Sequence, residues 1–277
     1  MVINASVFAL INLVLLFAFF DQGGKSFLHR IPEDLTLAAS SSPYGMLLRP
    51  WSLITHMFAH IQFGHFLFNM IALYTMGQVF VSVRGAKPLV AVYVMGGLSG
   101  YLLFALAFNF IPAFASRFES YVLGASAAVM AVTTAVATLK PRQHIFLFGA
   151  IRLELRWLAV ILVLLDLASV RTGVNSGGHI GHLGGAFFGY FYATQLLKGK
   201  DMGSWFSKMI DKISSFFNRR RMKVVTNNGR PKSDEQFNIE KKQRQKKIDE
   251  ILDKISRSGY DSLTKEEKEF LFRNSQK

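Results

Sequence analysis

The sequence of 277 residues contains no cysteine. This absence excludes disulfides, zinc sites built on cysteine and a cysteine nucleophile. The HExxH pattern of zinc metalloproteases is also missing. Acidic residues are scarce in the first 197 residues, which hold 6 Asp and Glu against 11 Lys and Arg, and Asp166 is the single acidic residue deep inside an apolar run. These absences remove several classes of enzyme at once.

The chain is rich in apolar residues and in basic residues, and the two kinds lie in different parts of the sequence. Apolar residues make up 51% of the chain, yet its formal net charge is +14, and most of the basic excess follows residue 197. A helix that crosses a bilayer needs about 20 mostly apolar residues. Six windows of roughly that kind occur, at residues 2–20, 63–83, 88–108, 120–139, 157–171 and 178–197. We therefore expect an all-α polytopic membrane protein, a six-helix transmembrane bundle.

The loops and the tail complete this organisation. Because Lys and Arg gather in alternate loops and in the tail, the positive-inside rule predicts that both termini are cytoplasmic. We expect a six-span domain over residues 1–197, a basic amphipathic juxtamembrane segment over 198–225, a linker over 226–238 and a cytoplasmic helical hairpin over 239–277. The second helix of that hairpin has a capping-box signature at Thr264 and Glu267.

Polar side chains at membrane depth are costly, so each one is a functional hypothesis. His65 and Asn69 are four residues apart on one helix face and can donate hydrogen bonds to one point. Ser126 follows Gly124 and Ala125 at the outer end of the fourth window, where free backbone amides of residues 125 and 126 could hold an oxyanion. Plainer interpretations exist: a serine in a membrane helix often only bonds its own carbonyls, and histidines 56 and 60 could sit at the water interface or tie down a loop.

In the sixth window, one face of the expected helix carries glycines and a single histidine. Gly178, His182, Gly185 and Gly189 recur at spacings of four, three and four residues. Such a stripe packs closely on another helix of small residues, and the segment around Ser126 is the best partner in the chain. That contact would let His182 act as the base that activates the serine. A metal site built only from histidines 56, 60, 65, 179 and 182 is an alternative, and a transporter would need repeats that the sequence does not show.

Taken together, these motifs resemble the rhomboid intramembrane serine proteases over about residues 1–197. The matching patterns are HxxxN from His65 to Asn69, GxS from Gly124 to Ser126, and GxxxHxxGxxxG from Gly178 to Gly189. The resemblance implies Ser126 as nucleophile, His182 as base, and the side chains of His65 and Asn69 beside the Ser126 amide in an oxyanion hole. The chain departs from the family where Ala127 and Met130 replace a common glycine and a common aromatic residue.

The function expected from sequence is therefore intramembrane serine endopeptidase activity on transmembrane helices. With no third acid in a plausible position, we expect a Ser-His dyad that needs no metal and no cofactor. The expected partners are transmembrane protein substrates and the lipid bilayer, not nucleic acid. The six-span form indicates a bacterial cytoplasmic membrane, with the site open to its outer face. The alternative is a catalytically inactive rhomboid-like protein that binds membrane helices.

Overall fold

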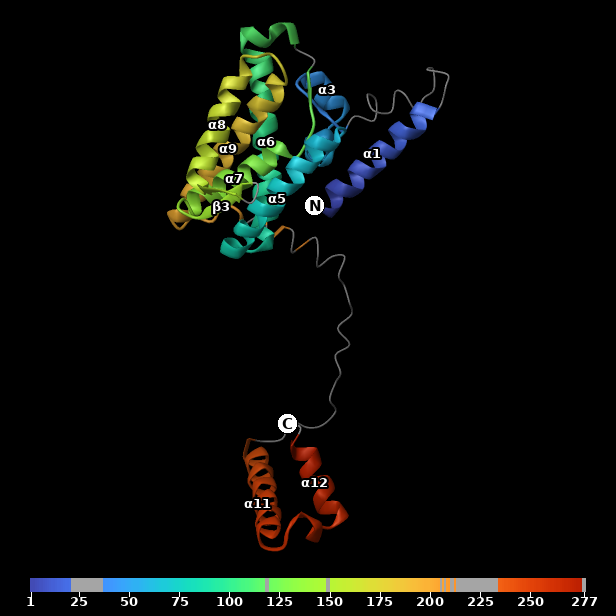
Figure 1. Cartoon of the computed structure of the whole chain (residues 1–277), viewed down its shortest axis with the longest axis vertical. Coiled ribbons are helices and arrows are strands. Elements are labelled where there is room, and N and C mark those ends of the chain that lie inside the picture. Colours follow the sequence, from blue (N-terminus) through green and yellow to red (C-terminus); the bar gives the residue numbers. More distant parts are fainter. Residues whose placement is uncertain are drawn as a thin grey trace. The chain divides into compact units, whose positions relative to one another are not determined.

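The computed structural model describes residues 1–20, 37–117, 120–147, 150–204, 206, 208–209, 212 and 234–275. The chain divides into two compact units, residues 1–218 and 219–277, and each is described by itself (Figure 1). The juxtamembrane segment expected over 198–225 and the linker expected over 226–238 fall largely outside the described residues.

Six helices of the first unit match the six apolar windows. They are α1 (Val2–Phe20), α5 (Phe63–Arg84), α6 (Ala86–Phe110), α7 (Ser126–Leu139), α8 (Leu155–Val170) and α9 (Ser176–Leu197). The expected all-α class is confirmed. By length and composition α5 and α6 can cross a bilayer, with mean hydropathies of 1.6 and 2.0, whereas α1 and α7 contribute shorter apolar stretches. Large apolar side chains such as Leu102, Leu164 and Phe187 are exposed on three different helices, as lipid contact requires.

Helix α7 is the core of this unit. It packs against α5, α6, α8 and α9, which surround it in Figure 1, and its residues 128–137 are all buried. Small residues allow this close packing. A Cβ atom added to Gly96 or Gly100 of α6, or to Gly185 or Gly189 of α9, would overlap an atom of α7. The backbones of the three helices therefore approach one another directly, as in other membrane helix pairs.

The connections between helices contain short elements that position the ends of α7 and α5. Strand β1 (Ala39–Ser40) pairs antiparallel with β2 (Tyr121–Val122), and the short helices α3 (Pro43–Leu48), α4 (Ser52–Thr55) and η1 (His56–Phe58) lead toward α5. The fourth window was expected to be helical from residue 120, which is wrong. The chain is extended at β2, and α7 begins only at Ser126, because Gly124 adopts a φ of 122° that ends any helix.

The described residues of the first unit contain three further short elements. After α6 the chain forms the 3₁₀ helix η2 (Pro112–Arg117). Between α7 and α8, strands β3 (His144–Leu147) and β4 (Ile151–Glu154) form an antiparallel hairpin that the sequence analysis did not predict.

The second unit is a helical hairpin whose first helix begins at Asp234, five residues earlier than expected and inside the segment 226–238 that was expected to be a linker. Helix α11 (Asp234–Ser258) is followed by η3 (Tyr260–Ser262) and α12 (Lys265–Ser275). The capping box is present: the backbone amide of Thr264 donates to the Glu267 carboxylate at 2.8 Å, and the Glu267 amide donates to the Thr264 hydroxyl at 3.3 Å. Lys254 of α11 donates to both carboxylate oxygens of Glu267 at 3.0 Å, and Ile251 and Leu263 are buried.

Candidate active site

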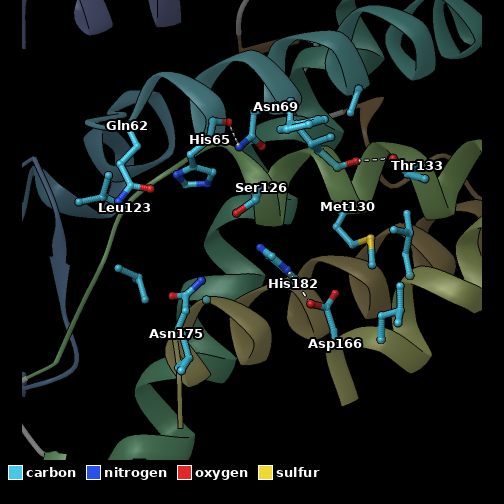
Figure 2. Close-up of a pocket in the computed structure, with 18 of the residues that line it drawn as sticks. Gln62, His65, Asn69, Leu123, Ser126, Met130, Thr133, Asp166, Asn175 and His182 are labelled. Atoms are coloured by element: carbon cyan, nitrogen blue, oxygen red, sulfur yellow. Dashed lines mark hydrogen bonds and ion pairs between the residues drawn. The ribbon is translucent and has the colours of Figure 1, made fainter. Parts of the chain in front are cut away.

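A pocket of about 900 Å³ opens where α5, α7 and α9 begin. The helix residues that line it include His65, Asn69, Ser126, Met130, Asp166 and His182 (Figure 2). Loop residues such as Gln62, Leu123 and Asn175 form the rest of its wall. Four helices thus contribute polar side chains to one cavity. The Ser126 hydroxyl and the His182 imidazole face each other across it (Figure 2), although no hydrogen bond links these two described side chains.

Ser126 is held in position by the loop that precedes it. The Gly124 amide donates to the His56 carbonyl at 2.8 Å, and the Ala125 amide donates to Nε2 of His60 at 3.2 Å. A Cβ on Gly124 would lie 2.6 Å from Cε1 of His65, so only glycine fits there. The expectation that the Ala125 amide helps to hold an oxyanion is wrong, because this amide already donates its hydrogen bond to His60. The Ser126 amide, at the first turn of α7, is the remaining backbone donor of that pair.

His56 and His60 are therefore internal residues that fix the loop, which agrees with the second of the two plain interpretations, that they tie down a loop, and not with a position at the water interface. Nδ1 of His56 lies 2.8 Å from the Ser52 carbonyl. Burial, together with the nearby His65, lowers the pKa of His60 to about 4, and burial also lowers the pKa of His56. His60 is neutral at pH 7, which leaves its Nε2 able to accept the hydrogen bond from the Ala125 amide. The two imidazoles hold the nucleophile loop against the segment before α5.

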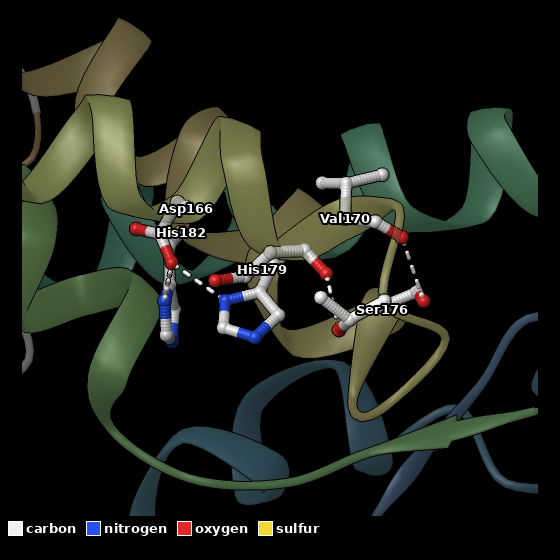
Figure 3. A network of polar contacts seen from close by, with 7 residues as sticks. Asp166, Val170, Ser176, His179 and His182 are labelled. Atoms are coloured by element: carbon white, nitrogen blue, oxygen red, sulfur yellow. Dashed lines mark hydrogen bonds and ion pairs between the residues drawn. The ribbon is translucent and has the colours of Figure 1, made fainter.

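His182 has a carboxylate partner that the sequence analysis excluded. Oδ1 of Asp166, on α8, lies 2.9 Å from Nδ1 of His182 and 2.7 Å from Nδ1 of His179 (Figure 3). Asp166 is buried, at 7% exposure. The expectation that no third acid lies in a plausible position is therefore wrong, because the Asp166 carboxylate contacts the His182 imidazole. The clue was present, since a lone acidic residue in an apolar run must find a donor or a cation.

The α8–α9 turn sets this arrangement. The Ser176 hydroxyl donates to the Val170 carbonyl at 3.0 Å (Figure 3), which ties the start of α9 to the end of α8. Asn175 adopts a left-handed conformation with a φ of 51°, and a Cβ on Gly178 would collide with its side chain. Farther along α9, Gly185 and Gly189 rest on the carbonyl oxygens of Ala127 and Ala131, respectively. This contact brings His182 beside the start of α7.

The other expected side chains also lie in the pocket. Asn69 donates to the His65 carbonyl at 2.8 Å, which leaves its second N–H free to donate elsewhere. His65 packs edge to face on His60, with ring centroids 5.2 Å apart. Met130 is buried and its thioether lies on the pocket wall near Asp166 (Figure 2). The pocket thus gathers a hydroxyl, an imidazole, a carboxylate and further hydrogen-bond donors.

Comparison with known proteins identifies the fold that carries this pocket. The model of the rhomboid domain matches residues 48–199, more than half of the chain. The chain belongs to the rhomboid family. Rhomboid proteins are in general intramembrane serine proteases that act on transmembrane substrates. Residues 232–277 match a second model, described as a family of unknown function (DUF6576).

Among curated rhomboid relatives, the chain is 28% identical over 158 residues to RHOMBOID-like protein 12, mitochondrial, of Arabidopsis thaliana. It is 31% identical over 153 residues to Presenilin-associated rhomboid-like protein A, mitochondrial, of Danio rerio, and 29% identical over 148 residues to Rhomboid protein 1, mitochondrial, of Saccharomyces cerevisiae. These alignments cover 54%, 50% and 53% of this chain, but only 47%, 36% and 42% of the relatives.

These relatives correct one expectation. The expected location is a bacterial cytoplasmic membrane, whereas all three relatives are mitochondrial. The bacterial assignment is therefore wrong. It rested on the number of spans alone, which does not distinguish one membrane from another.

Proposed function

We propose that this rhomboid family member is an intramembrane serine endopeptidase that cleaves transmembrane helices of other proteins. Ser126 is the nucleophile, His182 is the general base and Asp166 orients His182. The side chains of His65 and Asn69, with the Ser126 amide, stabilise the oxyanion. The six-span domain over residues 1–197 carries this activity. The mitochondrial location of these relatives supports a mitochondrial membrane for this chain.

One observation carries the proposal: the hydrogen bond between Nδ1 of His182 and Oδ1 of Asp166. A neutral imidazole has one proton, and with that proton on Nδ1 the lone pair is on Nε2. Nε2 can then accept the proton of Ser126 as its oxygen attacks the peptide carbonyl. The carboxylate stabilises the imidazolium that forms. In a pocket walled by protein this charge pair is less screened than in bulk water.

The remaining steps follow from the same groups. When the tetrahedral intermediate collapses, Nε2 of His182 gives its proton to the leaving amine, and the peptide bond breaks. Water then attacks the acyl ester of Ser126 while His182 takes its proton. When this second intermediate collapses, His182 gives the proton to the Ser126 oxygen, and the carboxylic acid leaves. Donors on His65, Asn69 and the Ser126 amide face the developing oxygen charge, a type of contact that contributes about a hundredfold or more in rate.

The substrate must expose a backbone carbonyl inside the membrane. A carbonyl in an intact helix is already hydrogen-bonded, so substrates are expected to have transmembrane helices that unwind readily, and the family resemblance adds a preference for small residues at the cleavage point. The loop residues on the pocket wall, such as Gln62 and Asn175, give water a polar route to Ser126.

The proposal is tested with the full chain in proteoliposomes and a panel of single-span reporters. The panel varies one transmembrane helix from leucine-only to one with central small residues, and mass spectrometry maps the new termini. We expect cleavage inside the helix by the wild type, favoured by small residues, and none by Ser126→Ala or His182→Ala. A folded wild type that binds the reporters without cutting any of them would support the inactive, helix-binding alternative. Equal cutting by Ser126→Ala would refute the assigned nucleophile.

A further inference from the structure

Asp166 has two imidazole partners, and the proposed mechanism uses only one of them. His179 and His182 are three residues apart on α9, and each directs Nδ1 at the same carboxylate oxygen (Figure 3). Their rings meet edge to face, with centroids 5.9 Å apart. Within the described residues, these two imidazoles are the hydrogen-bond partners of the Asp166 carboxylate. His179 has no part in proton transfer to or from Ser126, so its position needs a separate explanation.

The three side chains have the composition of an open metal site. Two imidazoles and one carboxylate form the ligand set of zinc sites that keep a fourth position open. One donor atom from each side chain lies within 4.8 Å of the others. Tetrahedral zinc, with bonds of about 2.0–2.1 Å, separates neighbouring donors by about 3.3 Å. The present separations of 2.7 and 2.9 Å from Oδ1 therefore need to widen by only about half an ångström.

An ion can also reach these donors. Asp166 and His182 line the 900 Å³ pocket, and the side chains of His179 and His182 are 23% and 22% exposed. The carboxylate supplies negative charge, and each imidazole can bind a metal through Nδ1 as a neutral ring once its proton has moved to Nε2. Imidazole nitrogen suits zinc and other late divalent transition metals.

We propose that His179, His182 and Asp166 form a binding site for a divalent transition metal, zinc above all, whose occupancy switches the protease off. The inhibitory part of this inference rests on the proposed function, whereas metal binding does not. Zinc bound to Nδ1 of neutral His182 leaves the only ring proton on Nε2. That nitrogen then has no lone pair to accept the Ser126 proton. The metal also replaces the hydrogen bond to Asp166, so the imidazole loses its orienting partner.

Binding is tested directly on the detergent-solubilised full chain, purified without a histidine tag. The probe is cobalt(II), followed by its visible absorption, and zinc is then added to displace it, as the affinity order of these metals requires. We expect one equivalent per chain. His179→Ala and Asp166→Asn should each weaken cobalt binding by tenfold or more. His144→Ala is the matched control, because His144 is an exposed histidine of β3 paired with Glu154, and β3 precedes α8 whereas Asp166 lies in the second half of that helix.

Inhibition is measured as the ratio of reporter cleavage with and without zinc, each variant being compared with itself. We expect micromolar zinc to inhibit the wild type and His144→Ala, chelator to restore activity, and His179→Ala to need at least tenfold more zinc. Binding that is unchanged in His179→Ala would overturn the site, even if the protease is active. Site-specific binding without inhibition of an active protease would overturn the switch. If no variant cleaves any reporter, the proposed function fails, and the cobalt titration still decides the metal site.

Discussion

Replacing Asp166 by asparagine measures what the buried carboxylate contributes to the proposed reaction. The substitution keeps the size of the side chain and removes its charge. Hydrogen bonds to charged groups contribute about 1.5–3 kcal/mol and neutral ones about 0.5–1.5 kcal/mol. Loss of charge at the 2.9 Å contact with His182 therefore removes about 1–1.5 kcal/mol, close to tenfold in rate.

A second effect adds to the first. The new amide can turn its NH₂ group toward His182, which would then hold its proton on Nε2 and could not act as a base. In serine proteases with a Ser-His-Asp triad, this replacement lowers kcat about 10⁴-fold through the wrong tautomer. We expect kcat for Asp166→Asn to fall by between about tenfold and about 10⁴-fold, with KM little changed.

The assay is reporter cleavage in proteoliposomes at saturating and subsaturating substrate, which separates kcat from KM. Ser126→Ala gives the background rate. Glu154→Gln is the matched control, since it removes a carboxylate that pairs with Arg156 at the opposite end of α8, and its kcat should stay within twofold of wild type. The midpoint of thermal unfolding must be similar in all variants. If Asp166→Asn keeps at least half of the wild-type kcat, the carboxylate plays no part and the reaction needs only Ser126 and His182.

Three further predictions concern the residues around Ser126. His65→Ala and Asn69→Ala should each lower kcat about a hundredfold without abolishing cleavage, because each removes one oxyanion donor; a loss as complete as that of Ser126→Ala, seen in single-turnover cleavage, would contradict this division of roles. Gly124→Ala should abolish cleavage and lower the unfolding midpoint, since its φ of 122° and its contact with His65 exclude a Cβ; full activity would show that the loop can move. Because the pKa of His60 falls from 6.5 to about 4 on folding, the unfolded chain binds more protons between these values, and stability should drop by up to about 3 kcal/mol as pH falls from 6.5 to 4. His60→Gln should flatten that drop in thermal unfolding measured across the range, whereas an unchanged slope would assign the titration to other groups such as His56.

The helices were the elements that the sequence predicted best. The second and sixth windows, 63–83 and 178–197, agree with α5 (Phe63–Arg84) and α9 (Ser176–Leu197) to within two residues at each end. A long apolar run leaves few structures other than a membrane helix open to the chain. The start of the fourth was misplaced because an apolar pair such as Tyr121–Val122 suits a strand as well as a helix. The β3–β4 hairpin was missed for a similar reason, as short strands between spans leave only a weak pattern.

The site was predictable where one helix carries the spacing. His65 with Asn69, and the glycine stripe around His182, follow from helix periodicity. The pairing of Asp166 with His182 does not, because it depends on how α8 packs beside α9, and no spacing within one helix encodes that. The hydrogen bond from the Ala125 amide to His60 could not be predicted either, because it forms only where the loop before α5 folds back onto the start of α7.

The central claim is that Ser126 is a nucleophile activated by His182. A fluorophosphonate serine probe tests it most directly on the solubilised full chain, with the labelled peptide mapped by mass spectrometry. We expect labelling at Ser126 alone in the wild type, none in Ser126→Ala, and a large loss in His182→Ala. A folded wild type that stays unlabelled, or labelling that persists undiminished in His182→Ala, would contradict it.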